Sequence, residues 1–216
     1  MIETTPTGRT NDALVWIDCE MTGLDPDKDV LVEIAVIVTD AELNPVDSGL
    51  DLVIATDPDK LAGMDDVVVD MHTASGLLTE LATATTTLEQ AEDQVLEYVK
   101  KYAPERRKAP LCGNTIATDR SFLARYMPRL DDHLHYRMID VSSIKELARR
   151  WYPRAYYNAP AKNGGHRALA DILDSITELR YYRATVLVPS PGPDTDTARA
   201  AAAALATGPD AAPPST

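Results

Sequence analysis

Cysteine is scarce in this sequence, with only Cys19 and Cys112 among 216 residues. Both lie in apolar surroundings, and two cysteines are too few for the disulfide framework of many small secreted proteins. No apolar run approaches the roughly 20 residues that a helix needs to cross a bilayer. The N-terminal residues MIETTPTGRTND carry no apolar signal region. We therefore expect a cytoplasmic protein without a membrane span.

Positive charge is also scarce, because 21 Lys and Arg residues stand against 34 acids, a formal net charge of −13. The first 100 residues carry 22 acids and 4 basic residues, whereas residues 101–170 carry 6 acids and 14 basic residues. The net value argues against a protein that coats long nucleic acids. The asymmetry fits either a solvated surface with chance clustering, or an acidic half that holds cations beside a basic half that meets phosphates.

The spacing of apolar residues indicates one folded domain between two polar ends. Strand-like runs occur at 13–20, 30–40, 49–55, 109–114 and 136–141. Helical spacing occurs at 87–103, 119–127, 143–151 and 167–186. Three strands with short connections, followed by alternating helices and strands, predict an α/β fold with a five-stranded mixed β-sheet flanked by α-helices.

The ends of the chain and one helix cap can be predicted as well. We expect residues 1–12 to be flexible, 13–188 to form the domain, and the Ala- and Pro-rich residues 189–216 to be a disordered tail with no apolar stripe. Ser142 or Ser143, with Glu146, is predicted to cap the helix at 143–151 as a capping box.

Two acids stand at the end of the first apolar run, in the stretch VWIDCEMTGLD (15–25). In a strand, Asp18 and Glu20 project from the same face, about 7 Å apart along the backbone, while Cys19 points the other way. Buried like charges either take up protons or gather cations, and carboxylate oxygens suit Mg²⁺ or Mn²⁺. The alternative is a strand end that emerges into solvent, where acids are common.

Further polar residues recur in contexts that suit this pair. Asp119 opens a helix after a strand, where an acid also has the simpler role of a partner for the helix dipole. Asp171 lies near the start of the final helix between apolar Ala170 and Ile172. His166 precedes it by five residues, and Gly164-Gly165 would let this histidine stand in the loop before the helix. A surface or capping role for His166 is the simpler alternative.

Taken together, these residues resemble the motifs of the DEDDh family of 3′→5′ exonucleases, in order and in spacing. The motifs are Asp18-x-Glu20, Asp119 and His166-x-x-x-x-Asp171. The stretches WIDCEMTGLDP, MHTASGL, LCGNTIATDRSFLARYMP, YRMIDVSSIKELARRW and HRALADI are similar to the oligoribonuclease branch. The resemblance covers roughly residues 13–187. It implies a ribonuclease H-like fold, a homodimer, and 3′→5′ hydrolysis of very short RNA, chiefly dinucleotides, to nucleoside 5′-monophosphates.

The resemblance also implies roles for single residues. Asp18, Glu20, Asp171 and Asp119 would hold two divalent ions, Mg²⁺ or Mn²⁺, with Asp18 shared between them. His166 would be the general base. Leu24 and Met64 would contact the bases. A pocket for the substrate's 5′-phosphate would include His72, Thr115, Tyr136, Arg137 and Ser142, some of them reaching across the dimer. Asn114 and His166 would also bind the substrate. Tyr136 matches a functional tyrosine of the family, but an aromatic at a strand start is also ordinary.

One position departs from the family pattern, and three other functions compete. Val67 stands where family members often carry an aromatic residue that helps to separate the bases. A related exonuclease that trims the 3′ ends of longer RNA or DNA is the nearest alternative. A metal-binding dimer without activity is another, and the complete set of five residues argues against it. A thiol redox role has no Cys-x-x-Cys motif to support it.

Overall fold

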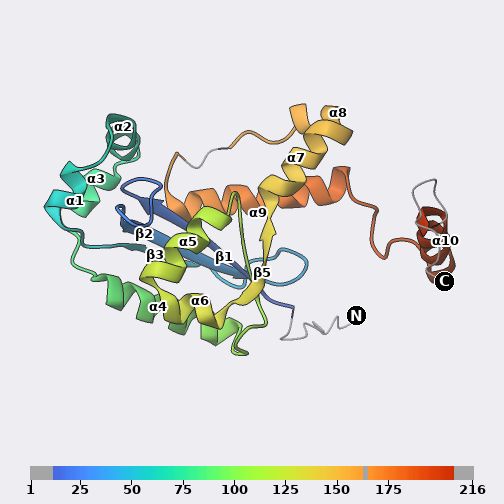
Figure 1. The fold of residues 1–216 in the computed structure, drawn as a ribbon, viewed down its shortest axis with the longest axis horizontal. Helices are drawn as coiled ribbons and strands as arrows, with labels where there is room; N and C mark the ends of the chain where they lie inside the picture. The colour runs from blue at the N-terminus through green and yellow to red at the C-terminus, as the bar shows by residue number, and fades with distance from the viewer. Residues whose placement is uncertain (1–11, 163–164, 207–216) are drawn as a thin grey trace, which may run out of the picture.

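A five-stranded sheet in the order β3-β2-β1-β4-β5 forms the centre of the computed structural model, which describes residues 12–162 and 165–206 (Figure 1). The strands are β1 (Leu14–Met21), β2 (Leu31–Thr39), β3 (Leu50–Val53), β4 (Pro110–Gly113) and β5 (His135–Asp140). β2 is antiparallel to both β1 and β3, whereas β4 is parallel to both β1 and β5. The predicted five-stranded mixed sheet is therefore confirmed.

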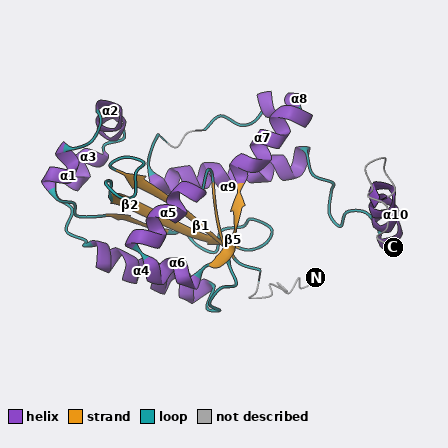
Figure 2. Ribbon diagram, viewed as in Figure 1, coloured by secondary structure: helices purple, strands orange, loops and turns teal. Residues whose placement is uncertain are grey.

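Helices lie on both faces of this sheet (Figure 2). They are α1 (Pro58–Ala62), α2 (Asp66–Ala74), α3 (Leu77–Leu81), α4 (Leu88–Tyr102), α5 (Ala117–Tyr126), α6 (Pro128–His133), α7 (Val141–Trp151), α8 (Pro153–Tyr157), α9 (Ala168–Thr185) and α10 (Thr195–Ala206). The four helices expected from apolar spacing correspond to α4, α5, α7 and α9. Helices α1 to α3 were not predicted, because each is short and three consecutive valines follow Asp66 in α2, which favour strands.

The strand β1 divides its side chains between two cores. Val15, Ile17 and Cys19 pack in the cluster that includes the buried face of α4, whereas Trp16 packs in the cluster of α7 and α9. Successive side chains of a strand alternate between faces, so Asp18 and Glu20 belong to the α9 face. All nine residues of β2 are buried, because this strand is covered on both sides. The sheet thus presents the two acids to α9.

The predicted cap of α7 is wrong. The helix begins at Val141, and the carboxylate of Asp140 accepts a hydrogen bond from the Ser142 backbone N–H at 2.9 Å. The Ser142 hydroxyl donates to Asn114 Oδ1 instead, at 3.0 Å. Glu146 pairs with Arg150 within the helix. Asp140 takes the cap because it ends β5 in an extended conformation immediately before the helix, which is the backbone geometry of an N-cap.

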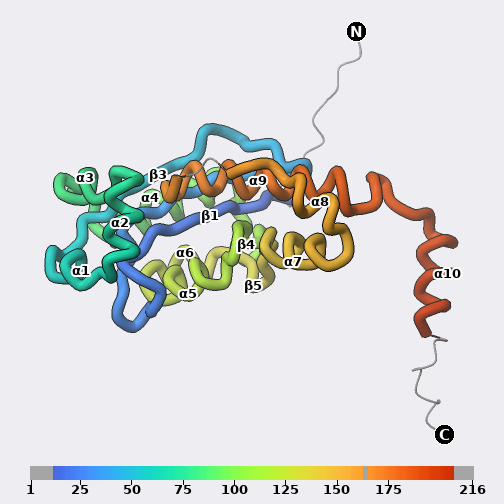
Figure 3. Tube along the Cα trace, turned by 90° about the horizontal axis from the view of Figure 1, so that it is seen from above, coloured from blue at the N-terminus to red at the C-terminus, as the bar shows by residue number. Residues whose placement is uncertain are grey.

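Helix α10 differs from the disorder predicted for residues 189–216. It is rich in alanine, which has the highest helix propensity. None of its residues is buried, and Figures 1 and 3 place it away from the sheet. Residues 207–216, and residues 1–11 of the predicted flexible N-terminus, lie outside the described ranges. Among the described helices, none combines the length and apolarity that a membrane span requires.

The packing of α9 can be tested on two of its side chains. Ile176 is 1% exposed, so Ile176→Ala should lower the free energy of unfolding by about 2–5 kcal/mol, because it leaves a cavity against the sheet. Leu173 on the same helix is 47% exposed, and Leu173→Ala should cost about 0.5 kcal/mol or less. Urea unfolding followed by circular dichroism measures both. Equal losses would contradict this orientation of α9.

Candidate active site

Three carboxylates meet where β1 ends near the start of α9. Asp18 and Glu20 come from β1, and Asp171 comes from the first turn of α9. One carboxylate oxygen of each residue lies within 4.8 Å of the others. Glu20 is only 8% exposed, so the pair is not a strand end that emerges into solvent. Sheet and helix together therefore create a concentrated negative charge.

Burial and mutual repulsion favour the protonated form of these groups. Burial first, and then the charges of Asp119 and Asp171, raise the pKa of Asp18 to about 9. Burial first, and then the charge of Glu33, raise the pKa of Glu20 to about 8. Burial also raises the pKa of Asp171, while the nearby charge of His166 opposes that shift. Cations bound by the three oxygens would relieve the repulsion.

Asp119 borders this cluster from the other side of β1. It lies in the first turn of α5, is 6% exposed, and accepts a hydrogen bond from the Cys19 backbone N–H through Oδ1 at 3.0 Å. Burial raises its pKa to about 7. Asp119 is not one of the three residues whose oxygens lie within 4.8 Å, yet its charge acts on Asp18. An acid that only interacts with the helix dipole would need neither this burial nor a hydrogen bond to β1.

His166 stands two residues before α9, outside the helix, as the loop interpretation predicted. Its backbone has φ of 61°, in the left-handed region that non-glycine residues rarely adopt, and its side chain is exposed. Its charge opposes the rise in the pKa of Asp171. The histidine is therefore accessible to a substrate at the edge of the acidic cluster.

His72 is placed differently from the other predicted pocket residues. Its side chain is fully buried on α2, where Nε2 lies 2.9 Å from the Met21 carbonyl oxygen and Nδ1 lies 3.9 Å from Glu20 Oε2. Helix α2 lies at the left of Figure 1, whereas strand β5 lies near the middle of the molecule, well apart from α2. Within one chain, the structure thus brings His72 to the acidic cluster and not to Tyr136 and Arg137 on β5.

Three of the predicted substrate-binding residues form one hydrogen-bond network at the ends of β4 and β5. The Thr115 backbone N–H donates to Ser142 Oγ and to Asp140 Oδ1, both at 3.0 Å. Ser142 in turn donates to Asn114. The backbone of Thr115 is in the left-handed conformation, with φ of 53°. Hydroxyl and amide groups are thus gathered at a partly exposed position.

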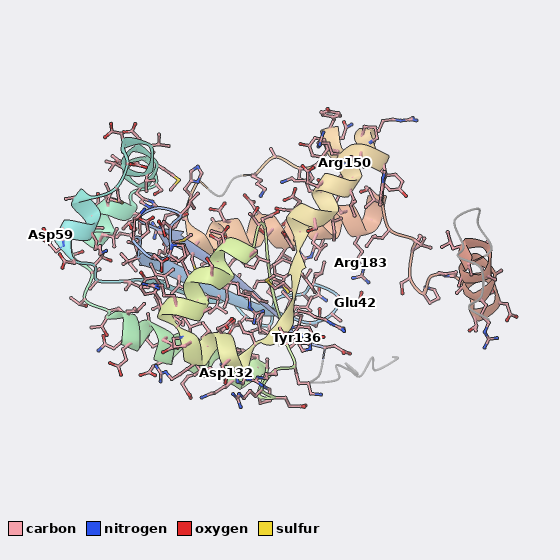
Figure 4. All side chains as sticks on the ribbon, in the orientation of Figure 1. Glu42, Asp59, Asp132, Tyr136, Arg150 and Arg183 are labelled. Carbon is pink, nitrogen blue, oxygen red and sulfur yellow. The ribbon has the colours of Figure 1, made fainter. Side chains whose placement is uncertain are left out.

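The remaining two pocket residues lie on β5, the outermost strand of the sheet. Tyr136 is 73% exposed at the start of this strand (Figure 4). Its ring stacks on His135 with centroids 4.5 Å apart, and its hydroxyl accepts a hydrogen bond from Arg137 Nε at 3.1 Å. Both side chains are available to a partner or a ligand.

The predicted base-contacting residues lie in and after the β1–β2 connection. Leu24 is 77% exposed, and Met64 precedes α2. The connection is held by Asp29, which accepts hydrogen bonds from the Thr22 hydroxyl at 3.1 Å and the Asp25 backbone at 2.9 Å. Val67, the departure from the family pattern, is 79% exposed. Leu24 and Val67 therefore present exposed apolar side chains in these two segments.

Three charged residues near the site were missed by the sequence analysis. Glu33 is fully buried on β2, opposite Glu20, and Arg167 pairs with it. Glu178 on α9 accepts from Asn114 at 3.1 Å and pairs with Lys145 at 2.9 Å. A single acid inside the apolar run LVEIAVIV was the available signal for Glu33. Nothing comparable marks Glu178.

The chain was compared with known families and relatives. A model of the exonuclease family matches residues 15–179, which contain all five motif residues. A protein named oligoribonuclease from Streptomyces griseus is 64% identical over 83% of this chain and 89% of its own length. This chain belongs to the oligoribonuclease family. Another member, from Mycobacterium bovis (strain BCG / Pasteur 1173P2), is 58% identical over 82% of this chain and 83% of its own length.

Solved structures support the same fold. Exonuclease I of E. coli in complex with a dA16 oligonucleotide has a TM-score of 0.62 at 14% identity, and exonuclease I of Methylocaldum szegediense has 0.56 at 19%. Each match covers 81% of this oligoribonuclease-family chain but only 41% of the larger structure. At this identity the likeness concerns the fold alone. The ribonuclease H-like fold expected from the resemblance is confirmed.

The raised pKa values predict how pH affects stability. Without metal, folded Asp18 and Glu20 bind protons up to pH of about 9 and about 8, whereas in the unfolded chain they release them near 3.8 and 4.5. The folded state binds more protons across that window, so stability should fall as pH rises through it. Chemical unfolding in EDTA from pH 5 to 8 measures this slope. Asp18→Asn should flatten it, and a rise in stability would contradict the assignment.

Proposed function

We propose that this chain hydrolyses short RNA oligonucleotides from the 3′ end, chiefly dinucleotides, and releases nucleoside 5′-monophosphates in the final step of RNA degradation. The convergence of Asp18, Glu20 and Asp171 is the observation that carries the proposal. The name of its relatives, oligoribonuclease, supports short RNA as the substrate class.

The acidic cluster fits divalent metal ions. Its donors are hard carboxylate oxygens of one buried and two half-buried residues, and burial is the largest cause that raises the pKa of each. Asp18, Glu20, Asp171 and Asp119 would hold Mg²⁺ or Mn²⁺, Asp119 either directly or through a water. When bound, two such ions supply an activated water and neutralise charge on the phosphate.

The protein's own residues would then handle the proton and the substrate. His166 accepts the proton of the attacking water at an imidazole nitrogen, since histidine titrates near neutral pH and this side chain is exposed beside the acids. Asp119 fixes the end of β1 through the Cys19 amide, so that the acids of this strand keep their positions. Leu24 and Met64 contact the bases, and Val67 contributes apolar contact without aromatic stacking.

The preference for short substrates follows from a pocket for the 5′-phosphate. Arg137 offers a planar fork for two phosphate oxygens, and the Thr115 and Ser142 hydroxyls satisfy others. Asn114 orients Ser142 by accepting its hydrogen bond. A closed pocket leaves no room for a further nucleotide, so a dinucleotide fills the site from end to end.

A homodimer explains the separation of the predicted pocket residues. Tyr136 and Arg137 lie on the edge strand β5, which β4 separates from β1 and its two acids in the same chain. In a dimer, Tyr136 of one copy would reach the acidic cluster of the other copy. His72 lies beside Glu20 of its own chain, with Nδ1 3.9 Å from Oε2. We propose that this dimer acts in the cytoplasm.

Substrate length is the first test. RNAs of two to seven nucleotides, labelled at the 5′ end, are incubated with Mg²⁺ or with EDTA. Dinucleotides should be lost fastest and only with metal, and Asp18→Asn and Asp119→Ala should abolish turnover, because each removes a carboxylate from the site. Accumulation of dinucleotides from longer chains would favour a trimming exonuclease of longer RNA or DNA. Mn²⁺ binding without released monophosphate would indicate a non-catalytic module.

The 5′-phosphate pocket has a separate test. Arg137→Ala should lower kcat/KM on a 5′-phosphorylated dinucleotide by about 10- to 100-fold, because it removes charged hydrogen bonds. The loss should be much smaller on a dinucleotide without that phosphate. Arg199→Ala on α10, which removes a pair with Asp196, is the matched control and should leave kcat/KM unchanged. Equal losses on both substrates would argue against a phosphate contact.

A further inference from the structure

A second buried acid lies beside the proposed metal ligands. Glu33 is fully buried on β2 and stands directly opposite Glu20 in the antiparallel register. Its charge raises the pKa of Glu20, so it adds to the repulsion within the site. An acid in this position needs a compensating charge, because an unpaired buried carboxylate is strongly disfavoured.

Arg167 supplies that charge. Its Nε donates to Glu33 Oε1 at 2.9 Å, and its Nη2 lies 2.8 Å from the same oxygen. The other oxygen, Oε2, accepts the backbone N–H of Ala168 at 3.1 Å. Both oxygens of Glu33 are therefore engaged by the protein, so this acid is not available as a metal ligand.

The guanidinium also reaches a second acid on a different element. Its Nη1 and Nη2 donate to the two carboxylate oxygens of Glu80 at 2.7 and 2.9 Å. Glu80 belongs to α3, and Glu33 belongs to β2. Arg167, the residue just before α9, thus ties the start of this helix to the sheet and to a neighbouring helix at once, in the fixed geometry that a planar fork imposes.

The residues on either side of this anchor are the ones that the reaction needs. His166 immediately precedes Arg167 and has φ of 61°, which persists only where the surroundings hold the backbone. Asp171 follows, and its backbone N–H donates to the Arg167 carbonyl oxygen at 3.0 Å. A displacement of Arg167 would therefore move both His166 and Asp171.

We propose that Arg167, held by Glu33 and Glu80, is a positioning residue that sets His166 and Asp171 relative to Asp18 and Glu20. The inference rests on the proposed function, in which His166 is the general base and Asp171 a metal ligand. Arg167 does not touch the substrate in this account. It acts by fixing where α9 begins.

The test compares Arg167→Met and Arg167→Lys with Arg183→Met, which removes an ion pair to Glu42 from the far end of the same helix (Figure 4). The double variant E33Q/R167M removes the buried charge together with its partner, so that loss of folding and loss of positioning are separated. Measurements are the unfolding midpoint, kcat and KM on a dinucleotide, and Mn²⁺ affinity by calorimetry. The fourth is the His166 imidazole resonance, which can be assigned because the chain has four histidines.

Arg167→Met and E33Q/R167M should lower kcat by roughly 100-fold with little change in KM. The reason is that His166 and Asp171 are displaced, while the residues that bind the dinucleotide are unchanged. Mn²⁺ affinity should fall, and the His166 resonance should move towards that of an unstructured peptide. Arg167→Lys keeps the charge without the fork and should restore only part of kcat. Arg183→Met should match the wild type in all four measurements.

Three results would overturn the inference. They are a wild-type kcat in folded Arg167→Met, a wild-type kcat in folded E33Q/R167M, and, if neither of these folds, a wild-type kcat in Arg167→Lys. If the wild-type protein fails to cleave RNA, the proposed function fails. In that case, Mn²⁺ affinity and the His166 resonance still decide whether Arg167 positions these residues.

Discussion

Repulsion between buried carboxylates is the constraint on which the rest of this molecule depends. Asp18, Glu20 and Asp171 are forced together although each raises the cost of ionising the others. The apolar packing of β1, β2 and α9 must supply the stability that opposes this repulsion. The fully buried strand β2 and the long helix α9 are therefore as important to the site as the acids themselves.

The contacts around the acidic cluster give each of the neighbouring acids Asp119 and Glu33 a partner and leave the three central carboxylates without an arginine in direct contact among the ion pairs of the described residues. The Cys19 amide binds Asp119, and the Arg167 guanidinium binds Glu33, so each outlying acid has a partner. The three central oxygens keep no such neutralising arginine in direct contact among the ion pairs of the described residues. A metal-dependent site requires that its central carboxylates stay unpaired, because an arginine among them would take the place of the ions.

The fold could be predicted well from the sequence because its strands are apolar and its long helices keep a regular period. The five strands and four long helices follow from those patterns, whereas α1 to α3 are too short to show one. The five motif residues could be found because their spacing resembles a known family. The buried pair of Glu33 and Arg167 could not, since 134 residues separate its members and only the folded sheet brings them together.

The alternation of β1 has a consequence for how this gene can change. Asp18 and Glu20 face α9, while Ile17 and Cys19 fill the opposite core, and Cys19 lends only its backbone to Asp119. Side-chain substitutions at Cys19 therefore leave the acidic cluster intact as long as they fit the core. A single inserted or deleted codon within β1 would instead exchange the two faces, burying the acids in the α4 core and presenting cysteine to the substrate. Substitution is thus tolerated at Cys19, on the face of this strand that packs in the core, whereas a change in the length of the strand is not tolerated.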